Sequence, residues 1–240
     1  MPGAMAIRGI LFDKDGTLLD FEATWAPLYR QLALELAGGD ADKARALLVR
    51  GGLDPATGRM RAGSVLGAGT TFDIVRLWFP ELEGEAFHAM AGRIDRAFHA
   101  HGEKHSVPVP DLLATLETLA NRGFTLGVAT NDGTGAAIRA LAGVGAGKHL
   151  PHIFGYDSVP NPKPAGDIVH AFATAIGATP AEVAVVGDNL HDLDMARAAG
   201  AGAAIGVLTG NSTAADLAPH ADAVLASISD LPAWLAQNRK

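Results

Sequence analysis

The sequence predicts an α/β fold, in which an all-helical domain is inserted into a doubly wound parallel sheet. Two observations carry the prediction. Beyond residue 106, short apolar runs that end in polar residues alternate with helical patterns, which is typical of a parallel sheet with helices on both faces. A first strand-like run at residues 7–13 stands apart, because the stretch after it has helical periodicity and no clear strand.

Composition limits the class of protein. With 240 residues, 48% of them hydrophobic, the chain can bury the core of one domain, or of one domain with an insertion. The net charge of −7 argues against a nucleic-acid partner. The absence of cysteine excludes disulfides and thiolate metal sites. Since no apolar run approaches about 18 residues and no signal pattern is present, we expect a cytoplasmic protein without a membrane partner.

Residues 7–13 form the first predicted strand, because the apolar run is too short for a helix and Gly16 soon follows it. Asp13 and Asp15 stand at its carboxyl end, where open parallel sheets bind their ligands. Their spacing lets both carboxylates face one small volume, so that one can attack a substrate while the other transfers a proton. Gly16 allows main-chain N–H groups to point at an anion, and the Thr17 hydroxyl can tie the turn together.

Two other interpretations of this turn exist. A calcium-binding loop that starts at Asp13 is excluded, since its glycine comes fourth rather than sixth and its twelfth residue is Thr24 rather than Glu. A plain acidic surface turn stays open on these residues alone.

The segment at residues 19–106 predicts several helices. Apolar residues recur at helical spacing over residues 25–36, and Asp40 is placed to cap a second helix at residues 41–49. Further helices are predicted over residues 72–79 and 85–101.

A glycine-rich segment at residues 51–71 carries Arg59 and Arg61. Their guanidinium groups are candidates for binding a substrate carboxylate or a second phosphate, and so for setting substrate specificity. A mobile, solvated loop is the favoured interpretation. The large aromatic residues of this domain are expected to pack inside it or against the sheet domain: Trp25, Trp78 and Phe79.

A proline-rich linker at residues 107–110 leads back to the sheet. Asp111 is expected to cap a helix, and residues 124–132 to form a strand that finishes on Thr130 and Asn131. A hydroxyl followed by N–H groups at the start of a helix suits a phosphate oxygen. The alternative is an N-cap and turn without a ligand.

Residues 152–157 predict a short strand, and Lys163 follows between two prolines that restrict its backbone. A helix is predicted over residues 165–176. A fixed ammonium at this place can neutralise charge on a nucleophile and on a transferring phosphoryl group. A surface turn is the alternative for an isolated Lys-Pro pair.

Residues 183–187 form another buried strand that ends before Asp188, and Asp192 lies in the first turn of the next helix. Acids at a strand end and a helix start can converge on one cation, and magnesium prefers a few carboxylates. A calcium loop is excluded because Leu190 occupies a ligand position. The alternative for Asp192 is a cap that the helix dipole favours.

The C-terminal segment predicts a strand at residues 201–210, a short helix after Ser212 or Thr213, an edge strand at residues 221–228 and a last helix that Asp230 caps.

Four of these stretches resemble, in order, the motifs of the haloacid dehalogenase-like (HAD) phosphohydrolase superfamily: DKDGTL at residues 13–18, Thr130-Asn131, Lys163-Pro164 and residues 188–192. The chain is most similar to phosphoglycolate phosphatase-like members with a helical C1-type cap. The resemblance implies a Rossmann-like HAD core at residues 1–18 and 107–240, and a helical cap domain at residues 19–106.

The resemblance also implies a role for each residue of these motifs. Asp13 is expected to be the nucleophile and Asp15 the acid and base, with Thr130 and Lys163 completing the catalytic set. The phosphoryl group is expected to be held by Lys14, Asp15, Gly16, Thr130, Asn131 and Lys163. Mg²⁺ is expected to be bound by Asp13, Asp188 and the main-chain carbonyl of Asp15, with Thr17 and Asp192 in support.

The implied activity is that of a Mg²⁺-dependent phosphatase that hydrolyses small phosphate monoesters, such as phosphoglycolate, through an aspartyl-phosphate. We expect a monomer or a homodimer. Asp15 and Asp188 favour this chemistry over that of a haloacid dehalogenase, which does not need the second acid. A phosphomutase and a non-catalytic protein that binds phosphorylated ligands are further alternatives. Asp20 and Phe21 depart from the Asp-Ser often seen in phosphoglycolate phosphatases, which bears on the substrate and not on the chemistry.

Overall fold

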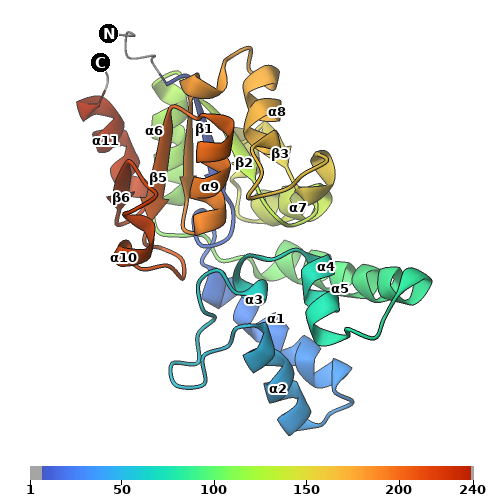
Figure 1. The fold of residues 1–240 in the computed structure, drawn as a ribbon. Coiled ribbons are helices and arrows are strands. Elements are labelled where there is room, and N and C mark those ends of the chain that lie inside the picture. The colour runs from blue at the N-terminus through green and yellow to red at the C-terminus, as the bar shows by residue number, and fades with distance from the viewer. Residues whose placement is uncertain (1–6, 239–240) are drawn as a thin grey trace.

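The computed structural model describes residues 7–238 and contains one six-stranded sheet (Figure 1). The outer ends of the expected core, residues 1–6 and 239–240, lie outside the described residues. The strand order is β3-β2-β1-β4-β5-β6, and every neighbouring pair is parallel. This confirms the predicted doubly wound parallel sheet. The strands are β1 (Gly9–Asp13), β2 (Thr125–Ala129), β3 (His152–Phe154), β4 (Val183–Gly187), β5 (Ala203–Val207) and β6 (Ala223–Leu225).

Helices cover both faces of the sheet. Side chains alternate along β1, so that Ile10 and Phe12 join the hydrophobic cluster on one face and Leu11 joins the cluster on the other. The first cluster includes α6 (Leu112–Asn121), α7 (Thr134–Gly143) and α11 (Leu231–Gln237). The second includes α8 (Asp167–Ala175), α9 (Leu190–Ala199) and α10 (Ala214–Leu217).

Five further helices lie together beyond the carboxyl end of the sheet (Figure 1). They enclose a hydrophobic cluster of their own, whose buried residues all fall between Phe21 and Phe98. This separate core supports the proposed division into a sheet domain and a cap domain at residues 19–106. The helices are α1 (Phe21–Leu36), α2 (Ala41–Gly51), α3 (Val65–Ala68), α4 (Thr71–Trp78) and α5 (Gly84–His105). No helix within residues 7–238 combines the length and the apolar character that crossing a membrane requires.

The structure corrects three local predictions. A mobile loop was expected throughout residues 51–71, but α3 forms there and its Leu66 is buried. Asp111 adopts a left-handed conformation (φ 58°), so its side chain makes no capping hydrogen bond to α6. The Asp230 side chain also caps nothing, because its backbone is already helical. Asp40, in contrast, accepts hydrogen bonds from the N–H groups of Asp42 and Lys43, which confirms it as an N-cap.

Phe172 on α8 shows why small residues occur in the central strands. Its ring is fully buried and lies directly over Gly9 of β1 and Gly127 of β2. A Cβ atom on Gly127 would come within 2.6 Å of this ring, and one on Gly9 within 2.8 Å. The two glycines therefore make the space that the phenylalanine fills between helix and sheet.

We expect Phe172→Ala to lower the free energy of unfolding by about 3–5 kcal/mol, because it leaves a cavity against a strand surface that cannot collapse. Denaturant unfolding measures this change. Leu113→Ala, at a residue whose exposed fraction is 42%, is the matched control and should cost far less. Equal losses in the two variants would contradict this packing account.

Candidate active site

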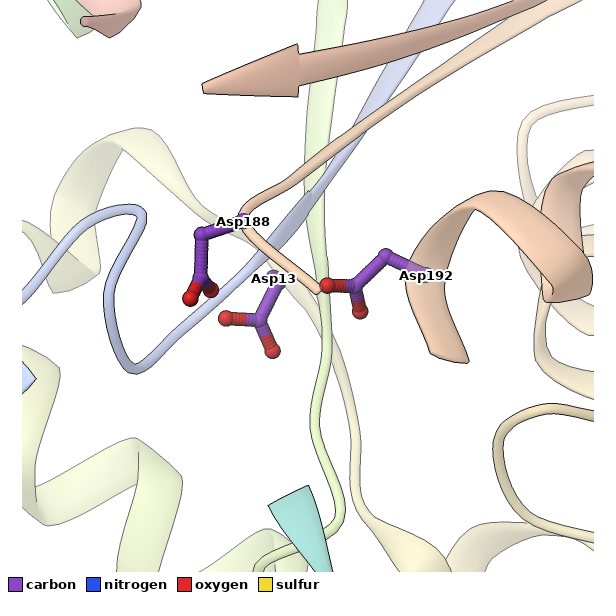
Figure 2. A group of neighbouring side chains, drawn as sticks. All are labelled: Asp13, Asp188 and Asp192. Atoms are coloured by element: carbon purple, nitrogen blue, oxygen red, sulfur yellow. The ribbon is translucent and has the colours of Figure 1, made fainter. Parts of the chain in front are cut away.

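Three buried carboxylates meet at the carboxyl end of the sheet. Asp13 ends β1, Asp188 follows β4, and Asp192 lies in the first turn of α9. Because β1 and β4 are parallel neighbours, their carboxyl ends lie side by side. One oxygen of each carboxylate lies within 4.8 Å of one oxygen of each of the others. Figure 2 shows all three side chains turned toward one shared region.

Two glycines permit this close approach. Gly16 has a φ of 90°, and a Cβ atom there would lie 2.6 Å from the Asp188 carboxylate. At Gly187 a Cβ atom would lie 2.3 Å from the Asp192 side chain. The buried Thr17 hydroxyl reaches the Asp188 carboxylate at 3.5 Å. Gly16 thus leaves room for the Asp188 carboxylate, and Thr17 contacts that carboxylate through its hydroxyl.

The ammonium of Lys163 links two of the carboxylates. Its Nζ donates to Asp13 Oδ1 at 2.6 Å and to Asp192 Oδ1 at 2.7 Å, and all three side chains are buried. Burial lowers the pKa of Lys163, but Asp13 and Asp192 raise it more, so the group stays protonated. Asp192 Oδ2 also accepts from the main-chain N–H of Asn189. Asp192 therefore completes the capping box of α9, whose N-cap is Asn189, and is also a partner of Lys163.

The three carboxylates of the cluster lie beside one ammonium group, that of Lys163, so negative charge is in excess. Burial raises the pKa of Asp13 to about 6, although Lys163 lowers it. Burial, with Asp13 and Asp192 nearby, raises the pKa of Asp188 well above its ordinary value. A divalent cation would remove this excess of negative charge, and oxygen-only carboxylate ligands suit Mg²⁺. The residues present therefore fit a magnesium ion, which the carboxylates of Asp13 and Asp188 would hold.

Asp15 faces the cap domain. Its Oδ1 accepts a hydrogen bond from Trp25 Nε1 of α1 at 2.6 Å, and its Oδ2 pairs with the Lys14 ammonium. Lys14 is fully buried and also pairs with Asp132 at 3.0 Å. Burial raises the pKa of Asp15 to about 6, although Lys14 lowers it. A carboxyl group that titrates near neutral pH can both give and take a proton during catalysis.

The loop after β2 adds a hydroxyl and an amide. Thr130 is buried, and its hydroxyl accepts from the main-chain N–H of Asp132 at 3.1 Å. Asn131 Nδ2 donates to the carbonyl of Ala68 in α3 at 3.0 Å and to that of Lys163 at 3.4 Å. Asn131 therefore connects the sheet domain to the cap domain directly beside the carboxylates.

A cavity of about 50 Å³ lies between the two domains at this point. Seven of the site residues expected from the sequence line it: Asp13, Asp15, Thr130, Asn131, Lys163, Asp188 and Asp192. Lys14, Gly16 and Thr17 do not line it. Arg59 and Arg61 are exposed and stand outside it, and Arg61 Nε donates instead to the Gly52 carbonyl.

The cap side of the cavity is mainly apolar, and none of its residues was predicted from the sequence to belong to the site. Its side chains come from Phe21, Trp25, Tyr29, Leu66 and Phe98. Trp25 packs on Phe98 at 5.6 Å between ring centroids, as expected for a cap residue, and it also binds Asp15. The signal was present in the sequence, since Phe21, Trp25 and Tyr29 recur every four residues on one helix face directly after the first aspartates. Asn189 and His191 line the cavity from the sheet domain.

Comparisons with known proteins agree with this architecture. A family model described as haloacid dehalogenase-like hydrolase matches residues 7–200. The chain is 30% identical to a phosphoglycolate phosphatase of Yersinia pestis over 94% of its length and 92% of the relative's. It is 28% identical to a phosphoglycolate phosphatase of Photorhabdus laumondii over 94% and 91%.

Solved structures show the same fold. A putative haloacid dehalogenase-like hydrolase from Bacteroides fragilis matches with a TM-score of 0.75 and 20% identity, covering 94% of this chain and 99% of the other. A predicted phosphoglycolate phosphatase from Haemophilus somnus matches with a TM-score of 0.73 and 22% identity, covering 95% and 98%.

The charge balance predicts how pH affects the protein without divalent cations. The pKa of Asp13 in the folded state, about 6, lies above its ordinary value of 3.8. The folded state therefore holds this proton more tightly, and the contribution of Asp13 to stability falls as the pH rises through that interval. We expect Mg²⁺ to raise the Tm by several degrees at pH 7.5 and by much less at pH 5, where protons compete for the carboxylates.

Asp188→Asn separates this effect from general ion binding. Without Mg²⁺ the variant should melt at or above the wild-type Tm at pH 7.5, because it removes a buried negative charge, and Mg²⁺ should not raise its Tm further. Asp194→Asn is the control on the same helix, because Asp194 is partly exposed and its one salt bridge within residues 7–238 is to His220. A Mg²⁺ response that survives in Asp188→Asn would place the cation elsewhere.

Proposed function

This chain belongs to the haloacid dehalogenase-like hydrolase family and is a phosphatase, and from that premise we propose that it hydrolyses small phosphate monoesters through an aspartyl-phosphate on Asp13, with Mg²⁺ as cofactor. One observation carries the proposal. A carboxylate at the end of a central strand is held by a buried ammonium and lines the same small cavity as a second carboxylate that titrates near neutral pH.

Asp13 supplies the nucleophile in the proposed reaction. One of its carboxylate oxygens forms a bond to phosphorus as the bond between phosphorus and the ester oxygen breaks. Lys163 holds Asp13 in place and offsets the negative charge that the phosphoryl group brings. Thr130 lies at the same cavity, so its hydroxyl can donate to a phosphoryl oxygen.

Asp15 supplies the proton transfers. As the ester bond breaks, its carboxyl group gives a proton to the leaving oxygen. Asp15, now a carboxylate, then takes a proton from the water that attacks phosphorus, which releases phosphate and restores the Asp13 carboxylate. Its pKa of about 6 suits both roles near neutral pH.

Asp13 and Asp188 are the proposed side-chain ligands of Mg²⁺, with the main-chain carbonyl of Asp15 from the family resemblance. When bound, the ion supplies positive charge to the phosphoryl oxygens. Asp192 is engaged with Lys163 and with the N–H of Asn189, so we assign it a supporting role.

The lining of the cavity bears on the substrate. The cap side of the cavity is apolar and aromatic. The named relatives are phosphoglycolate phosphatases, so we propose a phosphoglycolate-like ester as the first substrate to test. Among the described residues that line the cavity, Lys163 is the one lysine or arginine. A panel of esters should therefore include uncharged leaving groups beside phosphoglycolate.

The arrangement favours phosphatase chemistry over the other activities considered. A dehalogenase does not need the second acid, whereas Asp15 is held here by Trp25 and Lys14 at the cavity. No contact of the described residues favours a phosphomutase. We propose that the protein acts in the cytoplasm as a monomer or a homodimer.

Asp13→Asn should lower kcat by at least about 1,000-fold, because it removes the attacking group. Phosphate release from the ester panel in the presence of Mg²⁺ measures the loss, and Asp194→Asn is the control that should keep wild-type turnover. Wild-type turnover by Asp13→Asn, with deamidation excluded by mass spectrometry, would overturn the assignment. Binding of these esters by the wild-type protein without phosphate release from any of them would contradict the proposed reaction on small monoesters.

A further inference from the structure

Lys14 has no part in the mechanism above, yet it is among the most deeply buried side chains of the protein. Its exposed fraction is 0%, and its ammonium lies between the carboxylates of Asp15 and Asp132. The same ammonium lies 4.9 Å from the centroid of the Trp25 ring. A lysine in such a place needs a physical reason, because removing an ammonium from water costs several kcal/mol.

The contacts of Asp15 suggest that reason. Lys14 holds one oxygen of its carboxylate, and Trp25 Nε1 holds the other at 2.6 Å. The plane of the carboxylate is therefore fixed from two sides. One of these partners belongs to the turn after β1 and the other to the first helix of the cap domain.

Asp132 fixes Lys14 in turn. Its carboxylate contacts the ammonium at 3.0 Å. Its own backbone is held by the Thr130 hydroxyl, which accepts from its N–H, and by the N–H of Tyr156, which donates to its carbonyl. The loop after β2 thus anchors the ammonium that orients Asp15.

We propose that Lys14 is a positioning residue for phosphoryl transfer. Held between Asp15 and Asp132 and against the Trp25 ring, its ammonium sets the direction in which the Asp15 carboxyl group meets the leaving oxygen. This inference rests on the proposed function, because it assigns to Asp15 the proton transfer to that oxygen.

Stability alone does not account for this arrangement. A buried ion pair often contributes no more to stability than an apolar side chain of similar volume, because the cost of desolvation offsets the attraction. What an apolar side chain cannot supply is a fixed hydrogen-bond donor for one oxygen of Asp15. Proton donation depends on that orientation, since the donor must lie within hydrogen-bond reach of the leaving oxygen.

The leaving group distinguishes positioning from a structural role. An alkyl oxide is a strong base and needs its proton while the bond to phosphorus breaks, whereas a nitrophenyl oxide leaves readily without one. The ratio kcat/KM reports the steps up to phosphorylation of Asp13, so it isolates the step in which Asp15 donates. A misplaced Asp15 lowers kcat/KM for the alkyl ester selectively, whereas a loosened fold lowers it for both esters alike.

The experiment compares the wild-type protein with Lys14→Met, both as full chains with Mg²⁺, on propyl phosphate and p-nitrophenyl phosphate. We expect kcat/KM to fall by about 100-fold or more on the alkyl ester and by less than about 10-fold on the aryl ester, in keeping with the usual size of general acid catalysis. Trp25→Phe keeps an aromatic ring at this position and removes the other donor to Asp15, so it should show the same selectivity.

Lys14→Met leaves the Asp132 carboxylate without its partner and can fail to fold for that reason. Lys14→Met/Asp132→Asn removes this charge and keeps the test decisive. The double variant should melt near the wild-type Tm and should keep the selective loss on propyl phosphate. Equal losses on both esters, or recovery of alkyl-ester turnover in the double variant, would overturn the inference. If the wild-type protein hydrolyses neither ester nor phosphoglycolate, the proposed function itself is wrong.

Discussion

The site depends on the attraction between the buried ammonium of Lys163 and the carboxylates of Asp13 and Asp192. These three groups come from the segment before α8, from the end of β1 and from the start of α9, which lie far apart in the sequence. One ammonium does not balance the three acids of the cluster, because Asp188 is buried beside them. Protons or a divalent cation must supply the difference, and this requirement links the chemistry of the site to its stability.

The sheet makes this concentration of charge possible. β1 lies between β2 and β4, so the three strand ends place Asp13, Thr130 and Asp188 at one edge. Gly16 and Gly187 leave room for the carboxylates to approach. The cap domain completes the cavity with an apolar wall and adds polar contacts to residues of the site, such as the hydrogen bond from Trp25 to Asp15 and the one that the Ala68 carbonyl accepts from Asn131. The sheet domain thus carries the charged groups of the site, and the cap domain shields these groups from water.

Much of this arrangement could be predicted from the sequence. Strand ends are marked by an apolar run followed by a polar residue, and a parallel sheet brings such ends together, which is why Asp13 and Asp188 could each be placed at the carboxyl edge of the sheet. Their grouping around one cation was implied by the family resemblance. The α3 helix was missed because four residues in a glycine-rich segment show no helical period. The direction of the Lys14 side chain, turned inward to Asp15 and Asp132, depends on contacts between segments and leaves no local signal.

The residue that carries the phosphoryl group during turnover is the most direct test of this account. The protein would be mixed with a phosphate-radiolabelled ester and Mg²⁺, quenched in acid within one turnover, and digested for peptide mapping. The account predicts label on the peptide that contains Asp13, as an acyl phosphate that hydroxylamine releases. Turnover without labelled protein, or label on another residue, would contradict it.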